Sequence, residues 1–182
     1  MSITQPDSFA YLSFNGGTLV PRLSSTDIFN YQGTVNPISG VVVHDGGAVI
    51  DTDGRTGTVV SVPIEKATGK GVVDVADFTP LADRIGAPVV WITGDGTGAV
   101  AVAEWDLATR TVTGVRICAP GFGYTTATVT LYDHGGNRVE NYTAILGDNA
   151  GKGSFTKTGA GDLMLNAVNT WGGDTVLAGG TL

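Results

Sequence analysis

Apolar and polar residues alternate along residues 151–182, and glycine stands at nearly every reversal of this pattern. Alternation with a period of two places successive side chains on opposite faces of a strand, so the segment is predicted to form short β-strands with one buried face. Strands this short gain stability mainly by stacking on similar turns of chain above and below. The apolar positions that mark these strands are Phe155, Leu163, Leu165, Val176 and Leu182.

Similar short segments occur near the N-terminus, over residues 9–14, 17–20, 41–44 and 47–50, and turn-forming residues bound each of them. Between about residue 55 and residue 145 this rhythm is lost. Two rung-like regions that flank an irregular insertion are the simplest organisation. We therefore expect N-terminal β-solenoid coils over residues 1–54, an inserted β-rich lobe over residues 55–145 and a C-terminal repeat over residues 146–182.

The insertion carries signals for a hairpin and for one helix. Residues 99–105 and 111–117 are β-rich and flank a short polar connection, which is typical of a β-hairpin. Residues 77–86 carry a helix signal, with Thr79 as the capping residue, Pro80 at the first helical position and Gly86 at the end. The predicted fold class is therefore mainly β: parallel β-solenoid or β-helix coils with an inserted small α+β lobe that contains one short helix.

Composition narrows the function. Glycine accounts for 28 of 182 residues, which fits a protein with many tight turns, and the 42% hydrophobic content is enough to form a core. Ten lysines and arginines against 17 acidic residues give a net charge of −7. Nucleic-acid binding needs positive charge to neutralise phosphates, so the sequence argues against a nucleic-acid partner. No apolar run is long enough for a transmembrane helix, so we expect no membrane insertion by this segment.

The C-terminal segment closely resembles the autotransporter-associated β-strand repeat of large bacterial secreted and outer-membrane passenger proteins. That resemblance implies a β-solenoid stem without catalytic activity, an extracellular or outer-membrane location, and a parent chain longer than this one. Exposed ends of such coils would also permit self-association. The residues that carry the resemblance are Lys157-Thr158-Gly159-Ala160-Gly161, Leu163, Leu165, Asn169-Thr170-Trp171, Gly173-Asp174-Thr175-Val176 and Gly179-Gly180-Thr181-Leu182.

Aromatic residues provide the candidate binding site. Trp91, Trp105 and Tyr124 lie in the expected insertion, and exposed tryptophan and tyrosine rings commonly stack on sugar rings. The alternative is that these three side chains form the core of the insertion itself. The first functional hypothesis is therefore a structural and display role, with adhesion to host glycans, mucin or proteins through the inserted lobe.

Asp51, Asp53 and Asp95 are the candidate catalytic residues of an alternative function. Asp51 follows an apolar strand in an Asp-Thr-Asp-Gly sequence that partly resembles the Asp-Thr-Gly of pepsin-like proteases, and Asp95 would be its partner. Two carboxylates that share one proton can act as acid and base on a water molecule, so this alternative is a secreted aspartic-type endopeptidase acting on host glycoproteins such as mucins. The first two aspartates could instead close a solvated turn.

Three further expectations complete the sequence interpretation. Asp51 and Asp53 alternate as ligands do in calcium loops, so a weak divalent-cation site is an alternative at this turn, although no dedicated metal site or cofactor is expected. A third function, a β-structure like those of phage tails or spikes, would require an obligate trimer. Since no complete catalytic set occurs in the sequence, a non-catalytic role is favoured.

Overall fold

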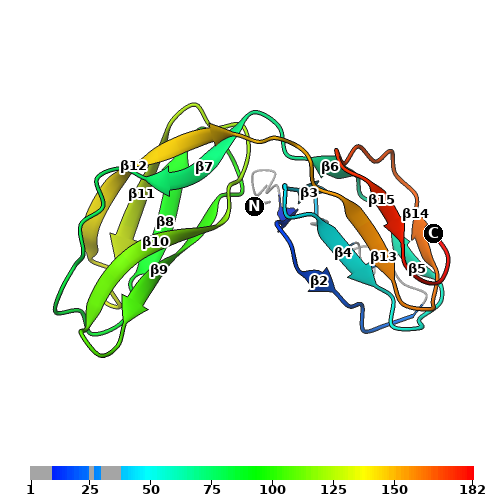
Figure 1. The fold of residues 1–182 in the computed structure, drawn as a ribbon, viewed down its shortest axis with the longest axis horizontal. Helices are drawn as coiled ribbons and strands as arrows, with labels where there is room; N and C mark the ends of the chain where they lie inside the picture. The colour runs from blue at the N-terminus through cyan, green and yellow to red at the C-terminus, as the bar shows by residue number, and fades with distance from the viewer. Residues whose placement is uncertain (1–9, 25–26, 30–37) are drawn as a thin grey trace, which may run out of the picture. The chain divides into compact units, whose positions relative to one another are not determined.

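The computed structural model describes residues 10–24, 27–29 and 38–182. The chain forms two compact units (Figure 1). The first unit contains Met1–Ala67 and Ala150–Leu182, and the second contains Thr68–Asn149. The second unit is therefore inserted in the sequence of the first, and its boundaries fall at 67/68 and 149/150, whereas the sequence placed them at 54/55 and 145/146.

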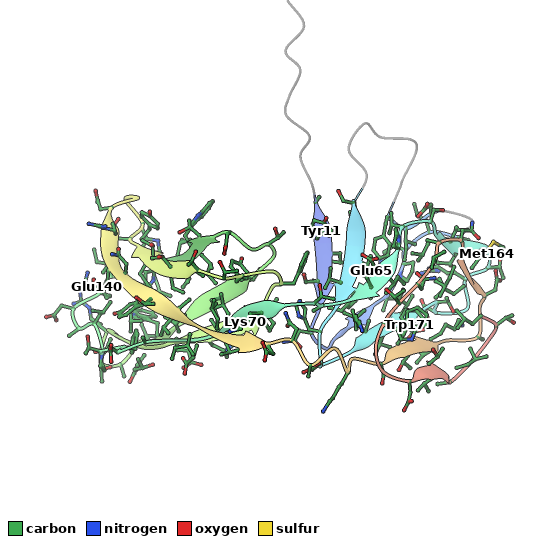
Figure 2. All side chains as sticks on the ribbon, turned by 90° about the horizontal axis from the view of Figure 1, so that it is seen from above. Tyr11, Glu65, Lys70, Glu140, Met164 and Trp171 are labelled. Carbon is green, nitrogen blue, oxygen red and sulfur yellow. The ribbon has the colours of Figure 1, made fainter. Side chains whose placement is uncertain are left out.

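Every strand pair of the first unit is parallel. Tyr11 and Glu65, labelled in Figure 2, lie on the two outer strands of its three-stranded sheet. That sheet has the order β1 (Tyr11–Phe14), β3 (Gly40–Val43) and β6 (Ile64–Lys66). A four-stranded sheet has the order β15 (Thr175–Leu177), β13 (Phe155–Thr158), β4 (Ala48–Asp51) and β2 (Thr18–Leu19). The remaining pair is β14 (Leu163–Leu165) with β5 (Thr58–Val60).

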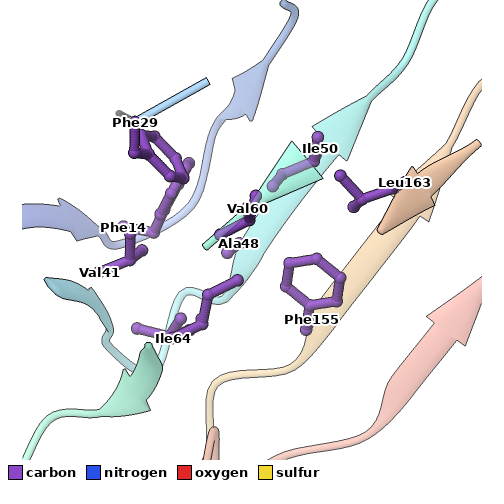
Figure 3. Close-up of a cluster of buried hydrophobic side chains, with 10 residues drawn as sticks. Phe14, Phe29, Val41, Ala48, Ile50, Val60, Ile64, Phe155 and Leu163 are labelled. Carbon is purple, nitrogen blue, oxygen red and sulfur yellow. The ribbon is translucent and has the colours of Figure 1, made fainter. Parts of the chain in front are cut away.

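The core of the first unit is made by alternate residues of these short strands, which point toward one another in Figure 3. Phe155 of β13 is fully buried there and stacks on Trp171, with ring centroids 4.7 Å apart. Ile50 of β4 and Leu163 of β14 belong to the same core. Because β13 and β14 pair with β4 and β5, more than 100 positions earlier in the sequence, the two ends of the chain form one core.

The second unit is antiparallel throughout its strand pairs. One hairpin joins β9 (Val100–Asp106) and β10 (Thr111–Ala119), which confirms the hairpin predicted for this region. Its own core includes Val72, Val112 and Leu131, each fully buried. The four-stranded sheet has the order β7 (Lys70–Val75), β12 (Arg138–Asp148), β11 (Ala127–Tyr132) and β8 (Val89–Gly94).

The helix predicted over residues 77–86 is absent, and the backbone explains why. Asp77 and Asp83 have φ angles of 53° and 58°, which a right-handed helix does not allow. Leu81 exchanges backbone hydrogen bonds with Val112 of β10 at 2.9 and 3.1 Å, so its polar groups are already used by a strand. A helix of this length is marginal by itself, and the tertiary pairing prevails over the capping signal.

The predicted fold class, parallel β-solenoid coils with an inserted α+β lobe, is wrong. The described residues contain strands and turns but no helix, and therefore no helix that could cross a membrane. The sheets are short, parallel and antiparallel pairing both occur, and the architecture includes a half-barrel. Alternating residues and glycine turns predict where strands lie, but they fix neither the partner of a strand nor the direction of pairing.

Candidate functional site

Trp91 is the most exposed of the three aromatic residues that the sequence put forward for binding. It lies in the middle of β8, the edge strand of the antiparallel sheet, and 60% of its surface is accessible. Its neighbours Val90 and Ile92 pack against the core of the second unit, so alternation along the strand turns Trp91 to the outer face. A large aromatic surface is therefore presented to solvent.

Trp105 and Tyr124 have a different environment. Trp105 is half-buried on β9 and packs against the core of the second unit. Tyr124 is 5% exposed, and its hydroxyl oxygen accepts a hydrogen bond from the Ala99 backbone N–H at 3.4 Å. Burial raises the pKa of Tyr124. These two rings serve the core of the second unit, so the structure does not bring the three aromatic residues together on one surface.

The outer face around Trp91 carries both apolar and polar side chains: Val89, two residues before Trp91 on β8, is 57% exposed, and polar residues lie on the neighbouring strands. Thr130 of β11 lies directly opposite Trp91, and Asn141 of β12 lies opposite Thr130, so the three residues form a row across the sheet. Side chains opposite one another in antiparallel strands share a face and interact. The next row on the same face consists of Thr93, Thr128 and Thr143. Thr130 is only 8% exposed, so the accessible hydroxyl and amide groups of these rows are those of Thr93, Thr128, Asn141 and Thr143. Sequence spacing alone could not reveal these cross-strand neighbours.

Asp51 and Asp53 lie together in a turn of the first unit. The Asp51 carboxylate accepts a hydrogen bond from the Asp53 backbone N–H at 2.8 Å. Asp53 has a φ of 48° and its carboxylate lies 3.4 Å from the Arg55 guanidinium. An aspartate side chain that bonds to the backbone two residues later forms an Asx turn. The two residues therefore stabilise the turn that follows β4.

Asp95 belongs to the second unit and is held by its own set of donors. Its carboxylate accepts hydrogen bonds from the backbone N–H groups of Thr125 and Thr126, both at 2.9 Å, and from the Thr125 hydroxyl. These bonds, the hydroxyl bond first, hold the pKa of Asp95 far below its ordinary value. Three donors thus satisfy the Asp95 carboxylate, and these bonds fit a structural role that holds residues 125 and 126 against the turn containing Asp95.

The geometry gives the divalent-cation alternative no additional ligands. Within the described ranges, no three or more histidine, cysteine, aspartate or glutamate side chains are grouped so that they could hold a metal ion. One oxygen of Asp51 already accepts the Asp53 N–H. The described residues thus provide two carboxylates in one turn, and calcium sites use six or more oxygen ligands.

Lys157 is an important residue that the sequence reasoning overlooked. It lies on β13 and is completely buried, and its ammonium donates hydrogen bonds to the carbonyl oxygens of Gly159, Gly161 and Gly179 at 2.7, 2.5 and 2.9 Å. It also donates to the Thr52 hydroxyl at 3.0 Å. Desolvation lowers the pKa of Lys157, while the nearby carboxylates of Asp51 and Asp162 raise it.

The arrangement around Lys157 ties two glycine turns, residues 159–161 and 179–180, to the core of the first unit. A buried ammonium is stable only where oxygen atoms replace its water shell, and the four acceptors do so here. One sequence signal for this burial was the alternation along the strand. Lys157 stands two positions after the buried Phe155 and therefore points to the same face. Because the Lys157 ammonium is hydrogen-bonded to these acceptors, it is not a free nucleophile. We therefore assign Lys157 a structural role.

Comparison with known proteins gives one match. The passenger-associated-transport-repeat family model matches residues 155–182, the segment that contains β13, β14, β15 and Lys157. The resemblance to an autotransporter passenger repeat is thereby confirmed for this segment. A repeat of this family indicates a surface or secreted protein. No curated protein and no solved structure matches the chain.

Proposed function

We propose that this chain is a segment of a bacterial secreted or outer-membrane passenger protein that supports and displays an adhesive unit. The observation that carries the proposal is the position of the matched repeat. Its strands β13 and β14 pair with β4 and β5 from the N-terminal part, so the repeat is a component of the first unit's core rather than an appended tail. The first unit is accordingly the scaffold.

The second unit is the displayed part of this proposal. The chain leaves the first unit after Ala67 and returns at Ala150, so the scaffold carries Thr68–Asn149 as an insertion between two of its strands. The two units have separate cores. An insertion with its own core can vary its surface without disturbing the core of the unit that carries it, which is the property that a display module needs.

Adhesion to host glycans is the binding function that best fits the surface of the second unit. Trp91 offers an exposed flat ring, and exposed threonine side chains, Thr93 and Thr128, lie in the next row of the same face. Ligand sites that fix orientation combine an apolar surface with a few polar groups in this way. The candidate carboxylates of the peptidase alternative, Asp51 and Asp95, instead accept hydrogen bonds from backbone N–H groups. Adhesion is therefore the preferred function.

Adhesion can be measured with beads that carry the full chain. The beads are allowed to settle on immobilised mucin, on mucin whose glycans have been oxidised with periodate, and on bare surfaces. The proposal expects retention on intact mucin under flow and a large loss after periodate treatment, with albumin-coated beads as the control. Retention of chain-coated beads at the albumin level on every surface would overturn the adhesive function.

A further inference from the structure

We propose that the outer face of strands β8, β11 and β12 is a binding site for a neutral hexose, with Trp91 as the stacking platform. This inference rests on the proposed function and specifies its ligand. Trp91 is the one aromatic ring among the exposed apolar side chains that the structure describes on the strands of the second unit, which also include Val73, Val89, Val100, Val102 and Ile145. Leu107 and Ile85 are exposed too, but they lie outside the strands. A sheet holds its side chains in fixed positions, which a binding site requires.

The arrangement suits a sugar because its polar groups stand at one side of the ring. In the row Trp91–Thr130–Asn141, neighbouring strands are about 4.8 Å apart, so the asparagine lies roughly 10 Å from the tryptophan across the sheet. A hexose whose C–H face covers the indole can therefore direct its hydroxyl groups toward the exposed Thr93 and Thr128 of the next row. Hydroxyl and amide side chains donate and accept hydrogen bonds, as sugar hydroxyls do.

The same rows explain why a protein partner is not favoured here. The centre of a protein interface is typically a fully desolvated apolar cluster with several aromatic or arginine anchors. On one side of Trp91 the next row, Thr93–Thr128–Thr143, is exposed and polar, and on the other side Val89 is 57% exposed and lies opposite the half-buried Tyr132. One exposed indole between a polar row and a small apolar row fits a ligand that has both C–H faces and hydroxyl groups.

Charge around the rows favours an uncharged sugar. The rows Trp91–Thr130–Asn141 and Thr93–Thr128–Thr143 contain no charged side chain. A polar hollow adjoins their β12 end and is lined by Asn141 and Thr143 together with Asp77, Thr79 and Glu140. Glu140 is labelled on β12 in Figure 2. Carboxylates can accept hydrogen bonds from sugar hydroxyls but repel an anionic glycan. One positively charged side chain lies nearby: Arg138 is in the flanking row, opposite Tyr132.

The test is a calorimetric titration of the full chain, carried out separately with N-acetyllactosamine, lactose and a sialylated N-acetyllactosamine. We expect binding of at least one neutral sugar. Trp91→Ala should lower that affinity by about tenfold or more, because covering an aromatic ring contributes on this scale. Trp91→Phe should retain part of the affinity, and Asn141→Ala should reduce it while leaving the ring in place. Leu107→Ala removes an equally exposed apolar side chain of the same unit and should change nothing.

Several outcomes would overturn the inference. These are equal affinity in wild type and Trp91→Ala, a preference for the sialylated sugar, or no binding of any of the three sugars by wild type. Thermal unfolding of each variant controls for folding, and Trp91 is exposed enough for its replacement to leave the fold intact. The bead assay separates this inference from the proposed function. If Trp91→Ala beads adhere to mucin as wild type does, the adhesive function stands and the Trp91 site fails.

Discussion

Replacement of Lys157 by methionine tests how the matched repeat is stabilised. Methionine keeps the length and apolar character of the stem but removes the ammonium. The carbonyl oxygens of Gly159, Gly161 and Gly179 then lose their shared donor. Since the lysine is completely buried, no bulk water reaches the ammonium position in the native structure.

The magnitude follows from the number of acceptors left without a donor. An unsatisfied buried acceptor costs about 1–3 kcal/mol, and the substitution leaves the carbonyls of Gly159 and Gly179 without the ammonium. The Gly161 carbonyl still accepts the Thr181 backbone N–H at 3.3 Å, and the Thr52 hydroxyl still donates to the Thr158 carbonyl at 3.2 Å. Removal of a buried charge recovers part of the desolvation cost, so the lower end of this range applies. We therefore expect the free energy of unfolding of the first unit to fall by about 2 kcal/mol, which corresponds to a decrease of roughly 8 °C or more in Tm for a unit of this size.

The two units allow the effect to be located. Trp171 lies in the first unit, whereas Trp91 and Trp105 lie in the second, so fluorescence in a Trp91→Phe, Trp105→Phe background reports the first unit alone. Lys152→Met is the matched control, because Lys152 is an exposed lysine of the same unit and its replacement should change the stability by less than about 0.5 kcal/mol. If Lys157→Met unfolds at the same temperature as Lys152→Met, the structural role given to the buried ammonium is refuted.

Three further substitutions have defined outcomes. Gly161→Ala should destabilise the first unit strongly, because a Cβ at this position would meet the Arg55 carbonyl oxygen. Gly40→Ala is the control, since a Cβ there finds only ordinary contacts of 3.4 Å and longer. Thermal unfolding should therefore give a lower Tm for Gly161→Ala than for Gly40→Ala. Asp95→Asn should lower the Tm of the second unit at pH 7. Because hydrogen bonds depress the folded-state pKa of Asp95, its stabilisation is present above about pH 4 and is lost as the pH falls, so the Tm difference from wild type should narrow in acid; a constant difference would contradict the reasoning. Trp171→Ala should destabilise the first unit by removing the stack on Phe155, and an unchanged calorimetric transition would show that this contact contributes nothing.

The features that the sequence predicted well depend on local patterns. The β9–β10 hairpin has a polar connection in which Asp106 accepts the Ala108 backbone N–H at 2.8 Å, a bond between residues two apart. The C-terminal repeat was identified from the order of its glycine, aromatic and apolar residues, and the family model matches the same segment. Both signals lie within a short stretch of chain, so no knowledge of distant partners was needed.

The features that the sequence missed depend on distant partners. The 77–86 segment carries a capping residue and a proline suited to a helix, but its backbone pairs with β10, some 30 positions later. The exposure of Trp91 and the burial of Tyr124 follow from which face of the sheet each residue occupies. Lysine is rarely buried, so residue type alone argues against an inward Lys157, and only its acceptors on two glycine turns make that position favourable.

For the candidate binding site too, the sequence identified a single residue but not its distant neighbours. Sequence reasoning proposed Trp91 as a binding residue, and the structure places it on an exposed sheet face. The threonine and asparagine residues that surround it come from two other strands, and only the register of β8, β11 and β12 identifies them. Asp51 lies in the first unit and Asp95 in the second. No local sequence pattern could therefore predict the pairing of carboxylates that the peptidase alternative needs.

The proposed function places this segment outside the cell, and surface labelling of intact cells measures that location. Antibodies raised against the second unit are applied to intact bacteria that produce the protein and, in parallel, to the culture medium. We expect labelling of unpermeabilised cells, or recovery of the protein from the medium, and loss of the surface signal after brief protease treatment of intact cells. Detection only after the cells are lysed would refute the proposed location.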